Sequence, residues 1–280
     1  MERNPSAYNK IRKLKYPLVM GILNLTTDSF SGDGLIQEKK VRERVGQIIH
    51  DGLTCIDIGA ESTRPGAKRV SEGDEKEKIL SAIKIVRSVS KDIWISVDTT
   101  RASVAQAAID EGVDIINDIS GGTFDPEMFR VIAENKNIFY VLSHVVGSFE
   151  TMHEKYVGKD VTEDVLSFWK QKISELTRLG VTNDRIICDP GVGFSKRLEE
   201  NCELIKNASR LVKSVGVPVL FGISRKRFIK TLSGTDDNDS LDRCSLFLHS
   251  ALLRDGVSII RTHEVSNTVN ALKIFNTTYA

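Results

Sequence analysis

Short apolar runs rich in valine and isoleucine alternate along this chain with longer segments of helical spacing, and this alternation leaves few possible folds. Runs of this kind are typical of strands buried on both faces, as in a parallel sheet. The runs lie near 18–23, 53–58, 93–97, 113–117, 138–142, 185–188, 217–223 and 257–261. The helical segments lie near 37–51, 74–90, 101–111, 126–135, 161–179, 199–214, 239–255 and 265–276.

Strands and helices in strict alternation predict an α/β protein, and their number predicts a (β/α)₈ TIM barrel. Since no linker rich in proline, glycine or serine divides the chain, we expect residues 16–280 to form one domain. The basic segment 1–15 is predicted to be a loosely ordered lead-in. A doubly wound open sheet is the alternative. Only the barrel brings the carboxyl ends of all strands to one mouth.

Composition restricts where the protein works and what it binds. The chain has 280 residues, 40% of them hydrophobic, and a net charge of +1 with both signs spread throughout. It therefore lacks the strong field that would hold nucleic acid or a membrane surface. No apolar stretch approaches the roughly 20 residues of a membrane span, and no signal peptide is evident. Four cysteines without a CxxC pair indicate free thiols in a reducing compartment, so we expect a soluble cytoplasmic protein.

Most of the apolar runs end in polar groups, which suggests one site assembled from many loops. The loop that follows the second run is the segment DIGAESTRPGA, Asp57 to Ala67. The residues that follow the other runs are Asn24, Asp98, Asp118, Asp189, Ser224 and His263.

Three of these strand ends carry groups suited to a flat polar ligand. Asp98 is an acceptor and Asn117 is both donor and acceptor, so the pair can bind the edge of a heterocycle. Asp189 begins DPGVGFSK, and its carboxylate can accept two parallel hydrogen bonds from an amidine-like edge. The alternative interpretation is that these side chains cap turns. Asp118 in particular can satisfy the backbone of its own loop.

Basic residues follow the last two runs. Ser224, Arg225 and Lys226 open a predicted helix, where backbone N–H groups and two cations suit an anionic group. Arg261 and His263 alternate along extended chain, so their side chains point the same way and suit a phosphate. An ordinary basic surface turn is the alternative for the first motif.

The loop from Thr26 to Gly34 is long and polar, with glycines flanking Asp33. It is either a mobile solvent loop or a lid over a site. The sequence shows no metal-binding cluster and no P-loop motif. Any metal is therefore expected to be Mg²⁺, held mainly by substrate phosphates and water with one protein oxygen.

Taken together, these segments resemble dihydropteroate synthase, the folate-pathway enzyme and sulfonamide target. The resemblance runs in order from about residue 18 to the C-terminus. The segments are ILNLTTDSFSGDG, DIGAESTRPGA, SVDT, INDISGG, DPGVGFSK, GISRK and IIRTHEV.

The resemblance implies a barrel, usually a homodimer, that joins 6-hydroxymethyl-7,8-dihydropterin pyrophosphate to 4-aminobenzoate and releases pyrophosphate. It implies that the pterin site contains Asp98, Asn117, Asp189, Phe194, Lys226 and Arg261, with Arg261 packed against the ring. It implies that Asn24 supplies the Mg²⁺ ligand. The pyrophosphate is expected near Thr63, Arg64, Arg261 and His263. The catalytic residues are then Asp98, Lys226, Arg261 and His263.

The resemblance also implies that two loops close over the site and complete the aminobenzoate pocket. The residues concerned are Asp28, Ser29, Phe30 and Asp33 in the first loop and Thr63, Arg64 and Pro65 in the second.

Several positions depart from the usual family pattern. Thr27 stands where proline is common, Ala60 replaces a frequent glycine, and Arg227 follows SRK where some members have serine. The first loop reads SGDG rather than SDGG, and LSH replaces LMH. These changes bear on aminobenzoate and sulfonamide binding more than on the pterin floor. A non-catalytic pterin-binding paralogue and a corrinoid-type pterin-dependent methyltransferase are the alternative functions.

Overall fold

The computed structural model describes residues 17–25, 34–63, 66–67, 69–154 and 158–279. Each predicted apolar run contains a strand, and most strands extend to include the polar residue at the end of the run. The strands are β1 Leu18–Asn24, β2 Cys55–Gly59, β3 Trp94–Asp98, β4 Ile115–Asp118, β5 Phe139–Ser143, β6 Ile186–Asp189, β7 Leu220–Gly222 and β8 Ile259–Thr262. The predicted lead-in, residues 1–15, lies outside the described residues, and the assignment of residues 16–280 to one domain stays a prediction.

The strands form one parallel sheet that closes on itself. Their order is β6-β5-β4-β3-β2-β1-β8-β7, so the two ends of this series are β6 and β7. A parallel bridge between Cys188 and Val219 joins these ends, and the Cys188 N–H donates to the Pro218 carbonyl at 2.9 Å. The (β/α)₈ barrel is confirmed, and the doubly wound open sheet is excluded.

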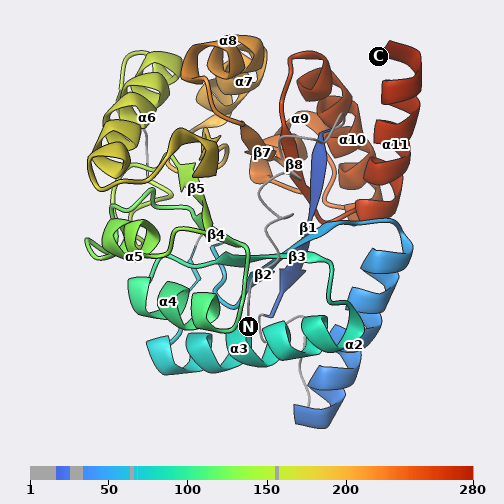
Figure 1. The fold of residues 1–280 in the computed structure, drawn as a ribbon. Coiled ribbons are helices and arrows are strands. Elements are labelled where there is room, and N and C mark those ends of the chain that lie inside the picture. The colour runs from blue at the N-terminus through green and yellow to red at the C-terminus, as the bar shows by residue number, and fades with distance from the viewer. Residues whose placement is uncertain (1–16, 26–33, 64–65, 68, 155–157, 280) are drawn as a thin grey trace.

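Helices surround the strands on the outside of the barrel (Figure 1). A helical region follows every strand along the chain. The helices are α2 Gly34–His50, α3 Glu72–Val89, α4 Ala102–Asp110, α5 Met128–Glu134, α6 Val161–Arg178, α7 Leu198–Lys206, α8 Ala208–Val215, α9 Arg227–Ser233, α10 Asn238–Arg254 and α11 Val265–Tyr279, with a 3₁₀ turn at Asn183–Arg185. Among the described residues, no helix has the length and apolar character needed to cross a membrane.

Local sequence explains where several helices begin and end. The Ser71 hydroxyl accepts from the Asp74 N–H at 3.1 Å, and acidic residues fill the first turn of α3. The single helix predicted at 199–214 is wrong, because the structure divides it into α7 and α8 at Asn207. The Asn207 side chain there donates to the Glu203 carbonyl at 3.0 Å. A short helix, α9, begins just after Lys226, as the SRK motif predicts.

An apolar layer fills the barrel interior, and every strand contributes to it. It consists of Leu18, Met20, Cys55, Trp94, Ile115, Phe139, Val141, Ile187, Leu220 and Ile259. Because side chains alternate along a strand, residues two or four positions further on face the same interior, closer to the carboxyl ends. In β2, β3, β4, β6 and β8 these positions are Asp57, Asp98, Asn117, Asp189 and Arg261. The barrel is therefore apolar inside and polar at its mouth.

Candidate active site

Arg261 holds two carboxylates together at the mouth. Its Nε lies 2.6 Å from Asp57 Oδ2, and its Nη2 lies 2.9 Å from Asp98 Oδ2. Burial raises the pKa of Asp98 to about 7, with Arg261 opposing the rise and the charge of Asp57 adding to it. Asp98 is therefore balanced between its neutral and ionised forms near neutral pH. The predicted contacts of Arg261 with a ring and a phosphate stay predictions.

Asp57 and Asn117 each present a buried hydrogen-bond acceptor that has no partner among the described residues. Asn117 Nδ2 donates to Asp57 Oδ2 at 3.0 Å. Within the described part of the chain, Asp57 Oδ1 and Asn117 Oδ1 are buried and receive no hydrogen bond. Since an unpaired buried acceptor costs about 1–3 kcal/mol, a ligand with N–H donors would bind here favourably.

Asp57 is the residue at this mouth that the sequence reasoning missed. It was treated only as the start of the loop that follows β2. The signal was present, because Cys55, Asp57 and Gly59 alternate along one face of the strand. Register also places Gly59 between Asn24 and Asp98, and Asp98 beside Asn117.

Asp189 ends β6, and Lys226 follows the neighbouring strand β7. Asp189 Oδ1 accepts from the Gly191 N–H at 2.8 Å. Burial raises the pKa of Asp189, and the charge of Lys226 opposes that rise. Lys226 Nζ donates to the Val192 carbonyl and lies 4.5 Å from the centre of the Phe194 ring. Burial lowers the pKa of Lys226 to about 8, against the attraction of Asp189. The motifs DPGVGFSK and GISRK therefore meet, as predicted.

Asp118 accepts hydrogen bonds from the backbone of its own loop, as the alternative interpretation predicts. One carboxylate oxygen accepts from the Ser120 N–H at 2.8 Å and from its hydroxyl at 2.6 Å. The other accepts from the Gly122 N–H at 2.8 Å and from the Tyr140 hydroxyl at 2.7 Å. The residue is fully buried and holds its own loop, so Asn117 rather than Asp118 presents its side chain to the mouth of the barrel from β4.

Lys196 is a second residue that the sequence reasoning overlooked. It belongs to the loop that follows β6, and its buried side chain reaches the loop that follows β5. Its Nζ donates to the carbonyl oxygens of His144, Gly191 and Phe194 at 3.0–3.2 Å, and lies 3.1 Å from His144 Nδ1. Burial lowers the pKa of Lys196 to about 7, with the charge of Asp189 opposing the fall. The Lys196 side chain therefore links the loop after β5 to the loop after β6.

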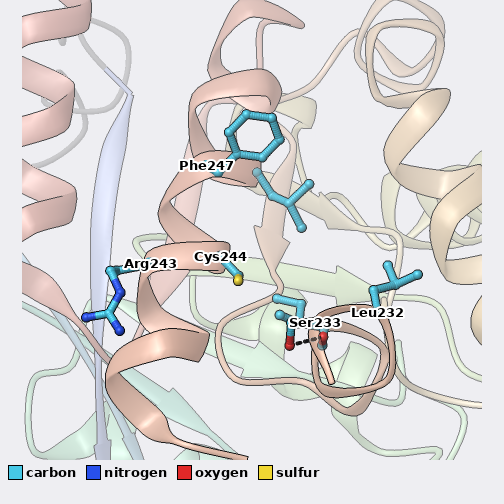
Figure 2. Close-up of a pocket in the computed structure, with 7 residues that line it drawn as sticks. Leu232, Ser233, Arg243, Cys244 and Phe247 are labelled. Carbon is cyan, nitrogen blue, oxygen red and sulfur yellow. Dashed lines mark hydrogen bonds between the residues drawn. The ribbon is translucent and has the colours of Figure 1, made fainter. Parts of the chain in front are cut away.

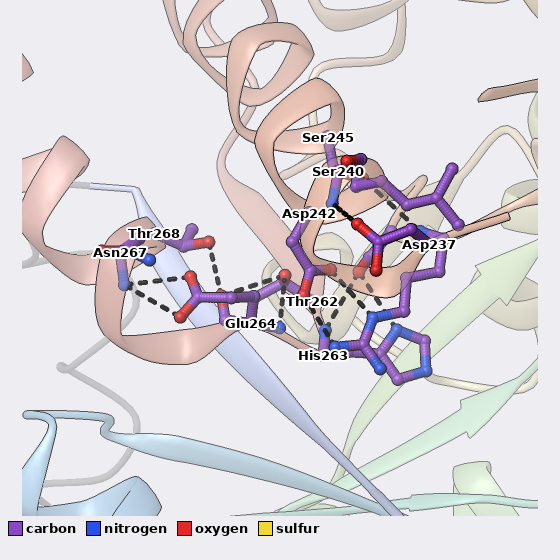
Figure 3. Close-up of polar contacts among 12 residues, drawn as sticks. Asp237, Ser240, Asp242, Ser245, Thr262, His263, Glu264, Asn267 and Thr268 are labelled. Atoms are coloured by element: carbon purple, nitrogen blue, oxygen red, sulfur yellow. Dashed lines mark hydrogen bonds and ion pairs between the residues drawn. The ribbon is translucent and has the colours of Figure 1, made fainter. Parts of the chain in front are cut away.

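Polar contacts surround His263, directly after β8, and Asp242, in α10 (Figure 3). His263 Nδ1 is 3.1 Å from the Ser224 hydroxyl, which also accepts from the His263 N–H at 3.2 Å. The Arg225 guanidinium makes two hydrogen bonds, at 2.8 and 2.7 Å, with the carboxylate of Asp242 in α10. Arg225 is therefore ion-paired with Asp242, and the expectation that Arg225 and Lys226 face the same place stays a prediction.

Asn24 and Asp98 border a small space above Gly59. A Cβ added to Gly59 would lie 3.8 Å from Asn24 Oδ1 and 3.8 Å from Asp98 Oδ2. The described residues contain no group of three or more His, Cys, Asp or Glu that could hold a metal ion. One amide oxygen beside one carboxylate fits Mg²⁺ held mainly by a substrate and water, rather than a site built wholly from protein.

The loop that follows β2 is described in part. Thr63 lies beside the loop that follows β5, where its carbonyl is 2.8 Å from His153 Nε2. The other predicted loop residues lie outside the described residues. They are Asp28, Ser29, Phe30, Asp33, Arg64 and Pro65.

A shallow groove lies outside the barrel, between α9 and α10 (Figure 2). Its volume is about 430 Å³, and its lining is mostly apolar, with Ile229, Leu232 and Phe247 among the lining residues. Phe247 is 75% exposed and Leu232 is 61% exposed. A groove with this lining suits contact with another apolar surface better than it suits chemistry.

Comparison with known proteins shows that the chain is similar to enzymes that bind pterins. The family profile described as "Pterin binding enzyme" matches residues 20–263. A dihydropteroate synthase from Streptococcus pyogenes serotype M1 is 37% identical over 249 residues, which are 88% of this chain and 90% of that protein. A folate synthesis bifunctional protein of Arabidopsis thaliana is 36% identical over 93% of this chain. The chain spans about half the length of the plant relatives, 56% and 48%.

Solved structures give the same result. The dihydropteroate synthase of Xanthomonas albilineans, solved with 4-aminobenzoic acid, superposes with a TM-score of 0.87 and is 32% identical over 95% of this chain and 94% of that one. The same enzyme in complex with 7,8-dihydropteroate gives a TM-score of 0.85 at 29% identity, over 96% of this chain and 95% of that one.

Proposed function

Because the chain belongs to the pterin-binding enzyme family, we propose that it is a dihydropteroate synthase, which joins 6-hydroxymethyl-7,8-dihydropterin pyrophosphate to 4-aminobenzoate and releases pyrophosphate. The chain covers most of the length of its bacterial relative with this name. A structural relative, the Xanthomonas albilineans enzyme, binds 4-aminobenzoic acid and 7,8-dihydropteroate.

The observation that carries the proposal is a pair of buried acceptors at the barrel mouth, Asp57 Oδ1 and Asn117 Oδ1, which receive no hydrogen bond from the part of the chain that the structure describes. A dihydropterin has several N–H donors along its edge, and these are the partners that such oxygens lack. Asp189 would receive further donors from the same ring, and Phe194 and Lys226 would lie along its side. We propose that Asp98 and Arg261 complete this pocket, with Arg261 against the ring.

The pyrophosphate would lie above the pterin, toward the loops. We propose that Thr63, Arg64, Arg261 and His263 surround it, and that Asn24 supplies the protein oxygen for Mg²⁺. When bound, Mg²⁺ would supply positive charge to the leaving group. The loops carrying Asp28, Ser29, Phe30 and Asp33, and Thr63 to Pro65, would complete the aminobenzoate pocket.

The reaction displaces pyrophosphate from the pterin CH₂. The C–O bond breaks with its electron pair on the pyrophosphate oxygen, and the aniline nitrogen forms the new C–N bond and then loses a proton. The nitrogen is neutral at pH 7 and needs no base, so expulsion of pyrophosphate is the difficult step. Arg261 and His263 would stabilise the departing charge, and the Asp98 carboxylate would stabilise positive charge that develops on the pterin methylene.

Pyrophosphate release is the direct test. It is expected only when both dihydropterin pyrophosphate and 4-aminobenzoate are present. Binding of pterin without release would indicate a non-catalytic paralogue, and methyl transfer would indicate the corrinoid-type enzyme. We also expect a large secondary deuterium isotope effect at the CH₂, because the path is dissociative, and a value near unity would contradict that path.

We further propose that the protein is a cytoplasmic homodimer. Its four cysteines are free, which suits a reducing compartment. The exposed Phe247 and Leu232 beside the groove between α9 and α10 are suited to pack against a second copy. Replacing Phe247 with aspartate should shift sedimentation toward the monomer, and an unchanged sedimentation coefficient would remove this face from the interface.

A further inference from the structure

We propose that His153, in the loop that follows β5, is a positioning residue that holds the backbone at Thr63 beside the pterin pocket. The inference rests on the proposed synthase function and adds a residue that no signature segment contains. His153 would not touch either substrate. It would act through Thr63, which lies 90 positions earlier in the chain.

The contact is between a ring nitrogen and the main chain. His153 Nε2 lies 2.8 Å from the Thr63 carbonyl oxygen. Since a carbonyl oxygen only accepts, Nε2 must carry the proton. Burial lowers the pKa of His153, so the ring is neutral at neutral pH, and one tautomer supplies the required donor. Because the contact is to the main-chain carbonyl, it holds the backbone at Thr63 and does not depend on the Thr63 side chain.

The His153 ring also reaches the pterin side of the site. Its centre lies 6.2 Å from the centre of the Phe194 ring, at an interplanar angle of 35°. Lys226 Nζ lies 4.5 Å from the centre of that same Phe194 ring. Contacts therefore run without a break from Lys226 through Phe194 and His153 to Thr63. They connect the proposed pterin floor to the loop proposed for the second substrate.

The loop that carries His153 is itself anchored. The Ser195 N–H donates to the Met152 carbonyl at 2.5 Å, and the Ser195 hydroxyl accepts from the Val146 N–H at 2.8 Å. Ser195 adopts a positive φ of 52°, which a residue other than glycine rarely does. These two hydrogen bonds join the loop after β6 to the loop after β5, and they hold the backbone next to His153 in place.

A second contact joins the loop after β2, which carries Thr63, to the loop after β5, which carries His153. The Arg69 guanidinium lies 4.9 Å from the centre of the Phe149 ring, and Arg69 also donates to the Thr100 hydroxyl at 2.8 Å. Loss of the His153 contact would therefore free Thr63 while leaving Arg69 and the pterin floor in place. This separation makes the role of His153 measurable.

The experiment uses the whole enzyme with three substitutions at one position. His153→Ala removes the ring, His153→Phe keeps a ring against Phe194 without the donor, and His153→Gln keeps a donor without the ring. His50→Ala is the matched control, because the His50 side chain is 85% exposed on α2. Pyrophosphate release is measured against 4-aminobenzoate concentration at saturating dihydropterin pyrophosphate. Pterin binding is measured by calorimetry with 6-hydroxymethyl-7,8-dihydropterin, which lacks the pyrophosphate that Thr63 is proposed to contact.

The Ala and Phe variants are expected to raise the KM for 4-aminobenzoate about fivefold, the change that one net hydrogen bond supports. Pterin affinity should stay within about twofold, and the Gln variant should recover most of the loss. KM values within twofold of wild type in both Ala and Phe variants would overturn the proposal. An equal loss of pterin affinity would overturn it too, since that indicates general damage. If the wild-type enzyme itself released no pyrophosphate, the proposed function would fail instead.

Discussion

Mild acid should destabilise the protein through one histidine that takes no part in the proposed chemistry. His249 lies on the buried side of α10, with 2% of its surface exposed. Neither ring nitrogen has a hydrogen-bond partner among the described residues. Burial lowers the pKa of His249 from 6.5 to about 3, because the folded protein offers nothing to stabilise the charged ring.

The size of the effect follows from these two pKa values. Between pH 6.5 and about 3 the unfolded chain binds a proton at His249 that the folded chain does not bind. The contribution to stability is therefore fully present above pH 6.5 and falls as the pH is lowered. At 1.36 kcal/mol per pH unit, the loss is about 2 kcal/mol at pH 5 and about 4 kcal/mol at pH 3.

Urea unfolding at pH 7 and pH 5 measures this loss. Replacing His249 with leucine should remove about 2 kcal/mol of the pH dependence, and the variant should be at least as stable as wild type at pH 7, because two unpaired nitrogens are gone. Replacing the exposed His50 with leucine should leave the pH dependence unchanged. The reasoning is refuted if wild type and the His249 variant lose equal stability between the two pH values.

Three further outcomes are expected. Replacing Lys226 with alanine should abolish pterin binding while the fold is kept, because its Nζ, 4.5 Å from the centre of the Phe194 ring, is proposed to contact the pterin; wild-type affinity by calorimetry would remove it from the site. Replacing Lys196 with methionine should lower the free energy of unfolding by about 1–3 kcal/mol, because the carbonyl oxygens of His144, Gly191 and Phe194 would lose a buried donor. The exposed Lys206→Met should cost less than about 0.5 kcal/mol. Turnover should rise with pH through about 7 as Asp98 ionises, and a rate profile of Asp98→Asn that kept this rise would assign it to another group.

The barrel was predictable because its signal is local. Each strand is a short apolar run followed by a polar residue, as in Trp94 to Asp98, and each is followed by a helical segment. Parallel strands connected in this way bring their carboxyl ends to one mouth. The meeting of Asp189 with Lys226 followed from the same geometry, although 37 positions separate them in the chain.

Other parts of the site were not predictable, because they depend on pairing between distant residues. The place of Asp57 in the candidate site is visible only from its hydrogen bonds with Arg261 of β8 and Asn117 of β4. The pairing of Arg225 with Asp242 of α10 has no signal in the sequence, since 17 positions separate the two residues. His153 lies in a segment with no motif, and its contact with Thr63 exists only because two loops meet.

The amino-acid sequence alone determined the alternation of strands and helices, the polar strand ends and the resemblance to a pterin-binding family, since each of these depends on residue types near one another in the chain. Tertiary structure decided which charges neutralise each other and which acceptors stay unpaired for a ligand. The physical reason is that burial and pairing set the energy of a charged or polar group, and both are properties of its neighbours in space.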